Sequence, residues 1–262
     1  MRRLIMAAAL AVAPGCFDSQ NGQQSSKRIY ALKYGESKYP ASLVNTLSRE
    51  RLVTLNWLVY LVVSENPPLN TLVDTGFDDP ALARQFGLQK TQSMGALLAL
   101  VGLKATDIHQ VFLTHSHFDH AHNLPQFTNS VIYLQSREYS SLADKSIAAF
   151  LSGVKSAGNL RLIEPGQMNH GIFETIFTGG HTPGSQAVRL VANGRNYVFT
   201  GDECYFADAC RAKVPLPAAA AYAPQKNRAF LRSLAESEVI LAGHETRLTG
   251  GRWLNDYVYL IE

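Results

Sequence analysis

Four potential metal ligands stand within six residues of one another, directly after an apolar run that is typical of a buried strand. They are His115, His117, Asp119 and His120. Imidazole nitrogen binds zinc, copper, iron and nickel, and a carboxylate adds negative charge to such a site. Residues two apart at a strand end project to one side, and the turn that follows lets the later pair reach a second centre. Five of the eight histidines fall between positions 109 and 122, which makes chance clustering a poor explanation.

Three later polar residues each follow a short strand-like run, and each has a glycine directly before it. They are His181, Asp202 and His244. Loops at strand ends are where a rigid scaffold commonly presents functional groups. Together with the first cluster, these residues predict one metal site assembled from several strand ends.

The body of the chain alternates short β-branched and aromatic runs with helical patterns, which predicts an α/β fold. Strands are expected at residues 28–33, 53–64, 69–74, 111–114, 131–134, 160–163, 173–177, 187–191, 197–200 and 239–241. Helices are expected at residues 80–86, 91–101, 136–154 and 224–235. No tandem repeat and no Gly-, Ser- or Pro-rich linker divides residues 28–262, so we expect one domain there.

The N-terminus has the pattern of an export signal. Arg2 and Arg3 precede an apolar run at residues 4–13 that is too short to span a bilayer. We expect residues 1–16 to be a signal peptide and the protein to be exported to the periplasm. Cys16 after glycine resembles a bacterial lipoprotein cleavage site, which predicts a lipidated membrane anchor; a signal cut nearby is the alternative. Residues 17–27 are polar and predict a flexible tether.

Charge patterning gives no indication of a nucleic-acid partner. The net charge is +3 from 24 basic and 21 acidic residues, and loss of Arg2 and Arg3 with a signal leaves 22 against 21, or +1. No basic run is present, so we expect no nucleic acid to bind. Cys204 and Cys210, six positions apart, are either a disulfide in an oxidising compartment, which we favour, or two thiols near the site.

In its ligand pattern the chain resembles the metallo-β-lactamase superfamily, whose order His-x-His-x-Asp-His, His, Asp, His it matches throughout. The resemblance runs from about residue 28 to residue 247 and includes the Leu-Val-Asp-Thr-Gly of residues 72–76. It implies an αββα sandwich with two divalent metal ions, zinc by default, at one edge between the sheets. The implied ligands are His115, His117 and His181 for the first ion, Asp119, His120 and His244 for the second, and Asp202 as the bridge.

Two positions near the histidine cluster stay open. Asp74 is implied by the resemblance to steady the histidine loop, although an ordinary turn carboxylate is the alternative. His122 stands where family members usually carry glycine. Its side chain either approaches the metals or, as we expect, faces solvent or caps the following turn. We expect His109 and His170 to be surface residues with no ligand role.

Within the superfamily, the chain resembles the N-acyl-homoserine lactonases. Tyr205 stands three positions after Asp202, where those enzymes carry a tyrosine that hydrogen-bonds the lactone carbonyl. Phe118 matches a phenylalanine that those enzymes often carry in their histidine motif, where it lies beside the substrate. A polar loop at residues 34–52 before Trp57 is a further similarity to that family. The implied reaction is attack of a bridging hydroxide on the ring ester, with Asp119 as proton shuttle. Residues 214–222 are the expected wall for an acyl chain, and both Phe118 and Tyr205 have packing as their alternative role.

Other hydrolases of the same fold are the main alternatives, acting on a glutathione thioester, an aryl ester or phosphotriester, or a β-lactam. Asp202 argues against a β-lactamase with three histidines at the first metal, because such enzymes generally lack the bridging aspartate. Arg247 and Arg252 are weak candidates for binding glutathione. A non-catalytic lipoprotein that stores or delivers zinc is the remaining alternative, and it predicts metal binding without turnover.

Overall fold

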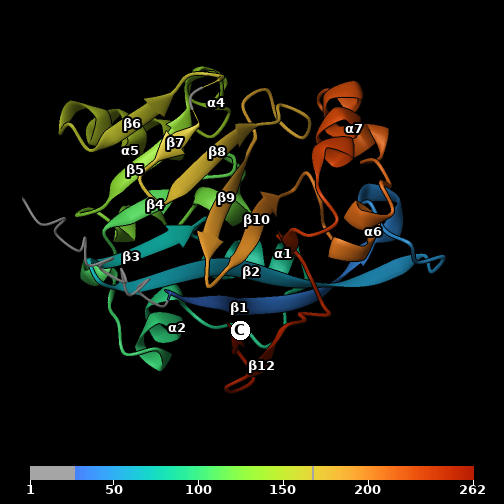
Figure 1. Ribbon diagram of the computed structural model, residues 1–262, viewed down its shortest axis with the longest axis horizontal. Coiled ribbons are helices and arrows are strands. Elements are labelled where there is room, and N and C mark those ends of the chain that lie inside the picture. The colour runs from blue at the N-terminus through green and yellow to red at the C-terminus, as the bar shows by residue number, and fades with distance from the viewer. Residues whose placement is uncertain (1–26, 167) are drawn as a thin grey trace, which may run out of the picture.

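The computed structural model describes residues 27–166 and 168–262, which build two β-sheets packed face to face (Figure 1). The predicted signal peptide, Cys16 and residues 17–26 of the predicted tether lie outside the described residues. Lys27, which we expected in the tether, already belongs to the first strand and pairs with Ser64. No helix in the described part of the chain is both long and apolar enough to cross a membrane.

The first sheet has eight strands in the order β12-β13-β1-β2-β3-β4-β5-β6. Their bounds are β12 Gly251–Trp253, β13 Val258–Ile261, β1 Lys27–Pro40, β2 Leu52–Glu65, β3 Pro68–Val73, β4 Gln110–Phe112, β5 Val131–Gln135 and β6 Leu160–Ile163. The pairs from β12 to β3 are antiparallel, and those from β3 to β6 are parallel.

The second sheet has five strands in the order β11-β10-β9-β8-β7. Their bounds are β11 Val239–Ala242, β10 Arg195–Gly201, β9 Gln186–Ala192, β8 Phe173–Phe177 and β7 Asn169–His170. Only the pair of β10 and β11 is parallel.

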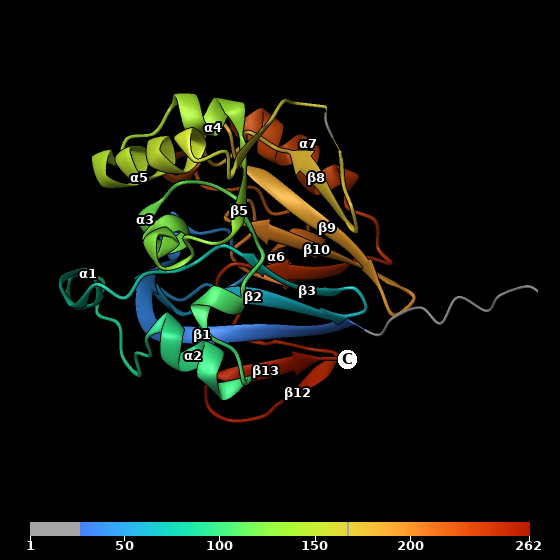
Figure 2. The same cartoon turned by 90° about the vertical axis from the view of Figure 1, so that its left-hand side faces the viewer.

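Side-chain alternation along the strands divides the apolar core into layers. On β1, Ile29 and Ala31 lie in a cluster between the two sheets, whereas Tyr30 and Leu32 face a cluster under helices. That second cluster includes residues of α2 (Met94–Leu100) and α5 (Lys145–Ser156). A third cluster covers the outer face of the second sheet with α6 (Ala207–Arg211) and α7 (Pro224–Ser233). The layers are therefore helices, sheet, sheet and helices, which confirms the predicted αββα sandwich (Figure 2).

The remaining helices are short. They are α1 (Pro80–Gln85), α3 (Phe118–Ala121), α4 (Ser136–Ser140) and the 3-10 turns η1 (Ala41–Leu43), η2 (Ala105–Asp107), η3 (Leu124–Gln126) and η4 (Ala218–Ala220). The single helix predicted at residues 136–154 is wrong, because the chain breaks between α4 and α5. Asp144 begins α5 by accepting hydrogen bonds from the backbone N–H groups of Ser146 and Ile147, as an N-cap does.

The predicted loop at residues 34–52 is wrong at residues 34–40, which belong to a strand, whereas residues 41–51 do connect two strands. β1 continues to Pro40 and pairs with β2 as far as Leu52, and η1 is the start of the connection. Buried Ser37 lies between partly exposed Glu36 and exposed Lys38, which is the alternation of a strand with one wet face. The polar residues on this solvent-exposed face are the reason that the sequence predicted a loop here.

Several strands end at one edge of the sandwich. The residues that follow β3, β4, β8, β10 and β11 meet there, and Gln186 of β9 joins the two sheets by donating its backbone N–H to the carbonyl of Thr114 at 2.9 Å. This edge holds all the ligand candidates of the sequence.

Candidate metal centre

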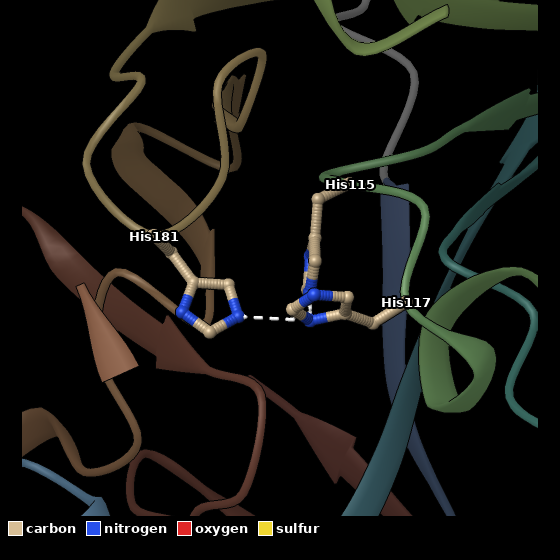
Figure 3. A group of neighbouring side chains, drawn as sticks. All are labelled: His115, His117 and His181. Atoms are coloured by element: carbon tan, nitrogen blue, oxygen red, sulfur yellow. Dashed lines mark hydrogen bonds between the residues drawn. The ribbon is translucent and has the colours of Figure 1, made fainter. Parts of the chain in front are cut away.

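The first group of ligand candidates is His115, His117 and His181 (Figure 3). His117 Nδ1 lies 3.0 Å from His115 Nε2 and 3.0 Å from His181 Nε2. The first two follow β4 and the third follows β8, so the two sheets contribute together. A single proton on His117 Nδ1 can serve only one of these contacts, whereas one metal ion accepts all three nitrogens.

The second group is Asp119, His120, Asp202 and His244, all of them buried. Asp202 Oδ1 lies 3.1 Å from His120 Nε2 and 3.3 Å from His244 Nε2. Asp119 Oδ2 lies 3.5 and 3.6 Å from the same two nitrogens. Among the described residues, Asp202 Oδ1 and both Nε2 atoms have no hydrogen-bond partner. Buried polar atoms are rarely left unpaired, so this group fits a bound cation.

Asp202 lies between the two groups. Its Oδ1 faces His120 and His244, and its Oδ2 lies 3.7 Å from His181 Nε2. One carboxylate thus offers one oxygen to each group. Asp202 follows β10, where Gly201 has a φ of +50° and a Cβ would lie 2.5 Å from Thr114 Oγ1, so only glycine fits the turn that delivers it.

The ring protons of the histidines are held away from the centre. His181 and His244 each place Nδ1 against a backbone carbonyl oxygen, at 2.7 and 3.2 Å. His120 Nδ1 lies 2.8 Å from Asp74 Oδ2. Carbonyl and carboxylate oxygens only accept, so Nδ1 is the donor in each ring. When these rings are neutral, every Nε2 presents a lone pair to the centre, which is the tautomer that a metal ligand needs.

Asp74 reaches both groups. Besides His120, it accepts hydrogen bonds from Thr114 N at 2.7 Å and from Thr114 Oγ1 at 2.8 Å. Since the hydroxyl of Thr114 has given its one proton to Asp74, it accepts from His115 Nδ1 at 3.1 Å. Asp74 has a φ of +66°, a left-handed conformation that aspartate tolerates better than most residues. These contacts with Thr114 and His120 go beyond those of an ordinary turn carboxylate, which was the alternative role for Asp74.

Two buried glutamates at the centre were missed by the sequence analysis. Glu138 accepts hydrogen bonds from the backbone and hydroxyl of Ser116, the hydroxyl of Thr182 and the backbone of Gly184, so it ties together the loops of both histidine segments. Glu203 accepts from the backbone of residues 180 and 181. The place of Glu203 directly after Asp202 was a usable signal. Glu138 offered none, since it stands in a helix far from the motifs.

The remaining histidines belong to neither group. His122 ends α3 as its C-cap and is half-buried, His109 is exposed, and half-buried His170 contacts Thr175 Oγ1 at 3.2 Å. Cys204 and Cys210, both fully buried, form a disulfide with Cα atoms 5.8 Å apart, in the usual range.

A cavity of about 310 Å³ opens beside the ligand groups. Aromatic and aliphatic side chains line most of it, together with members of both groups: Tyr39, Leu43, Leu55, Trp57, Phe86, His117, Phe118, Asp119, His181, Asp202, Tyr205, Ala219, Ala220 and His244. No lysine or arginine is among these lining residues. Of the expected acyl wall at residues 214–222, only the two alanines line the cavity, and Tyr222 is 62% exposed.

Phe118 and Tyr205 combine packing with exposure to this cavity. Phe118 stacks on Phe86 with ring centroids 4.7 Å apart, and Tyr205 stacks on His244 at 5.1 Å. Burial raises the pKa of Tyr205 well above its ordinary value, and the charges of Asp202 and Asp119 raise it further. Its phenol is therefore a neutral hydrogen-bond donor beside the ligands.

The family model of the metallo-beta-lactamase superfamily matches residues 58–244, which include both ligand groups. The chain belongs to the metallo-beta-lactamase superfamily. It is accordingly a hydrolase with a candidate divalent-metal site at the edge of an αββα sandwich.

Among curated relatives, N-acyl homoserine lactonases of Bacillus are similar to this chain. That of Bacillus thuringiensis is 25% identical over 239 residues, which cover 84% of this chain and 93% of the relative. That of Bacillus cereus is 28% identical over 178 residues, which cover 63% and 70%.

Solved structures of lactonases share the fold. An N-acyl homoserine lactone hydrolase, solved with the product N-hexanoyl-L-homoserine at its catalytic metal centre, has a TM-score of 0.69 at 22% identity and covers 85% of this chain and 94% of its own. AidC, a dizinc quorum-quenching lactonase, has a TM-score of 0.63 at 15% identity, with coverage of 92% and 96%.

The protonation of His120 should report metal binding. Burial lowers the pKa of His120, but Asp119, Asp202 and Asp74 together raise it well above its ordinary value. Without metal, His120 should hold a proton on Nε2 at pH 7 in addition to the one on Nδ1, and zinc must displace it, so zinc affinity should rise with pH. Histidine-ring NMR before and after zinc addition measures this, with resonances assigned from a His120→Gln variant.

His122 is the internal control, because it lies two residues away and outside both groups. Its ring signals should keep the same protonation state when zinc is added. A neutral His120 ring in the metal-free protein at pH 7 would contradict the charge arrangement described here.

Proposed function

We propose that the chain is a dinuclear metal-dependent lactonase that opens the ring of N-acyl-homoserine lactones. The observation that carries this proposal is the cavity of about 310 Å³, which is mostly apolar, has no lysine or arginine in its lining and borders both ligand groups. Such a cavity suits an uncharged polar ring with an aliphatic tail, because a few polar groups orient the ring and the apolar walls bury the rest.

Two divalent ions, zinc by default, fit the residues of the centre. His115, His117 and His181 would hold the first, Asp119, His120 and His244 the second, and Asp202 both. Among the described residues, Asp119 and Asp202 form ion pairs only with histidines, so bound cations would offset their buried charge. Such ions supply a water-derived nucleophile at neutral pH and polarise a carbonyl oxygen.

The protein groups around the cavity have complementary tasks. The neutral phenol of Tyr205 donates a hydrogen bond to the ring carbonyl oxygen, where negative charge develops as the ester is attacked. Burial raises the pKa of Asp119, but His120 and His244 lower it by more, so this carboxylate is ionised and can accept the proton that the attacking water-derived nucleophile gives up. Asp119 then passes that proton to the departing alkoxide of the opened ring.

The lining of the cavity disfavours two of the rival substrates. Glutathione and the β-lactams carry carboxylates, which proteins usually bind with arginine or lysine. Arg247 lines a separate cavity with Lys38 and Arg211, and Arg252 forms an ion pair with Glu262. Neither arginine is available at the metal centre. Aryl esters and phosphotriesters are uncharged, and only an assay separates them from lactones.

Replacing Tyr205 with phenylalanine tests the lactonase proposal. Tyr205→Phe should bind metal normally and lose about tenfold in kcat/KM on a homoserine lactone, or ~1.4 kcal/mol of transition-state stabilisation. The loss is smaller than for a sole oxyanion donor, because the metal shares the task. Proton release on ring opening measures the rate. Tyr222→Phe is the matched control, since that phenol is exposed and outside the cavity, and it should react like the wild type.

The same assay compares a homoserine lactone with a glutathione thioester, an aryl phosphotriester and a cephalosporin. The lactone should be the best substrate of the wild type. Faster turnover of another class would contradict the substrate proposal. Zinc binding without turnover of any of them would favour the storage protein instead.

We also propose that the protein is exported and anchored through a lipidated Cys16. The buried disulfide of Cys204 and Cys210 supports an oxidising compartment. The full chain expressed in a diderm bacterium should fractionate with membranes, and Cys16→Ser should move it to the soluble periplasmic fraction. A soluble wild type would refute the anchor, and a cytoplasmic one would refute export.

A further inference from the structure

Glu203 follows Asp202 directly, and its carboxylate faces the loop that carries His181. Its Oε1 accepts hydrogen bonds from the backbone N–H groups of Gly180 and His181, both at 2.9 Å, and from Ser185 Oγ at 2.7 Å. The side chain is 1% exposed, so no bulk water replaces these donors. One oxygen of the Glu203 carboxylate therefore fixes the main chain at His181, a ligand candidate that follows β8 rather than β10.

The other oxygen connects the same loop to α7. Glu203 Oε2 accepts from Asn227 Nδ2 at 2.7 Å, and the amide oxygen of Asn227 accepts from the backbone N–H of Leu216 at 3.0 Å. Asn227 is fully buried, and its position is set from both sides. The carboxylate of Glu203 thus has a fixed partner on each oxygen and little freedom to rotate.

The loop approaches Glu203 closely only because residue 180 is glycine. A Cβ on Gly180 would lie 2.3 Å from Glu203 Oε2 and 2.9 Å from the Asn227 backbone. The main chain of the loop is therefore packed directly on the carboxylate. The ring of His181 is held at its far side by a carbonyl oxygen, 2.7 Å from Nδ1.

We propose that Glu203 is a positioning residue that fixes His181 opposite Asp202, and so maintains the first ligand group. This inference rests on the metal centre proposed above. Asp202 Oδ2 and His181 Nε2 lie 3.7 Å apart although they come from different loops. Glu203, the residue directly after Asp202, accepts a hydrogen bond from the backbone N–H of His181. Glu203 makes no hydrogen bond to Asp119, His120 or His244 among the contacts of the described residues. Its loss should weaken one ion and spare the other.

The test is a zinc titration of the metal-free protein, comparing the wild type with Glu203→Gln. The glutamine keeps the size of the side chain, but its amide –NH₂ faces either the N–H groups of the loop or the amide of Asn227, so a donor meets a donor. One of the two binding steps should weaken at least tenfold, as loss of a partner that orients metal ligands commonly does. The second step should stay within about twofold of the wild type.

Glu245→Gln is the matched control. Glu245 is also buried, also follows a ligand candidate directly, and accepts hydrogen bonds from the backbone of residues 207 and 247. Within the described part of the chain, Glu245 makes no hydrogen bond to the His181 loop. Glu245→Gln should therefore leave unchanged the binding step that Glu203→Gln weakens. Ser185→Ala removes one donor and keeps the Glu203 carboxylate. It should weaken the same step by less than Glu203→Gln, and it decides the matter if that variant does not fold.

The outcomes separate this inference from the proposed function. Wild-type affinities for both ions in Glu203→Gln, or an equal loss at both steps with a lower Tm of the metal-free protein, would overturn the positioning role alone. A wild type that binds no zinc would overturn the metal centre, and this inference with it.

Discussion

The structure depends most on the buried carboxylate of Asp202 between two sets of imidazole nitrogens. One oxygen lies 3.1 and 3.3 Å from nitrogens of His120 and His244, and the other lies 3.7 Å from His181. Desolvating such a charge costs several kcal/mol unless it is compensated. The histidine protons that might compensate it are mostly held on the far nitrogens. Bound divalent metal would satisfy both the carboxylate and the facing lone pairs.

The fold serves this arrangement by bringing strand ends from two sheets to one edge. Layers of apolar side chains on both faces of each sheet fix the strands, and the loops beyond them carry the ligand candidates. Loops alone would not hold distances near 3 Å. Three more buried carboxylates do so here. Asp74 links the segments after β3 and β4, Glu138 links the segment after β4 to the loop after β8, and Glu203, which follows β10, links that loop to α7. Negative charge is thus arranged around the centre as well as within it.

The ligand candidates and most strands could be predicted from the sequence because their signals are local. A ligand at a strand end beside glycine is visible in a few residues, as at Asp202. The αββα fold followed from family resemblance rather than from the strand pattern. Glu138 could not be found, because its role depends on contacts with residues 22 to 46 positions away. The prediction ended β1 at residue 33 because its outer half has a solvent-exposed face. It missed β12 and β13 because they are short and join the sheet only through the pairing of β13 with β1, which is distant in sequence.

The most direct test of this account is anomalous diffraction from crystals of the zinc-loaded protein, measured at the zinc absorption edge. The account predicts two peaks roughly 3.5–4 Å apart, the spacing of two-metal hydrolytic sites, with the carboxylate of Asp202 between them. One peak should lie among His115, His117 and His181, and the other among Asp119, His120 and His244. A single peak, or two that do not share Asp202, would contradict it.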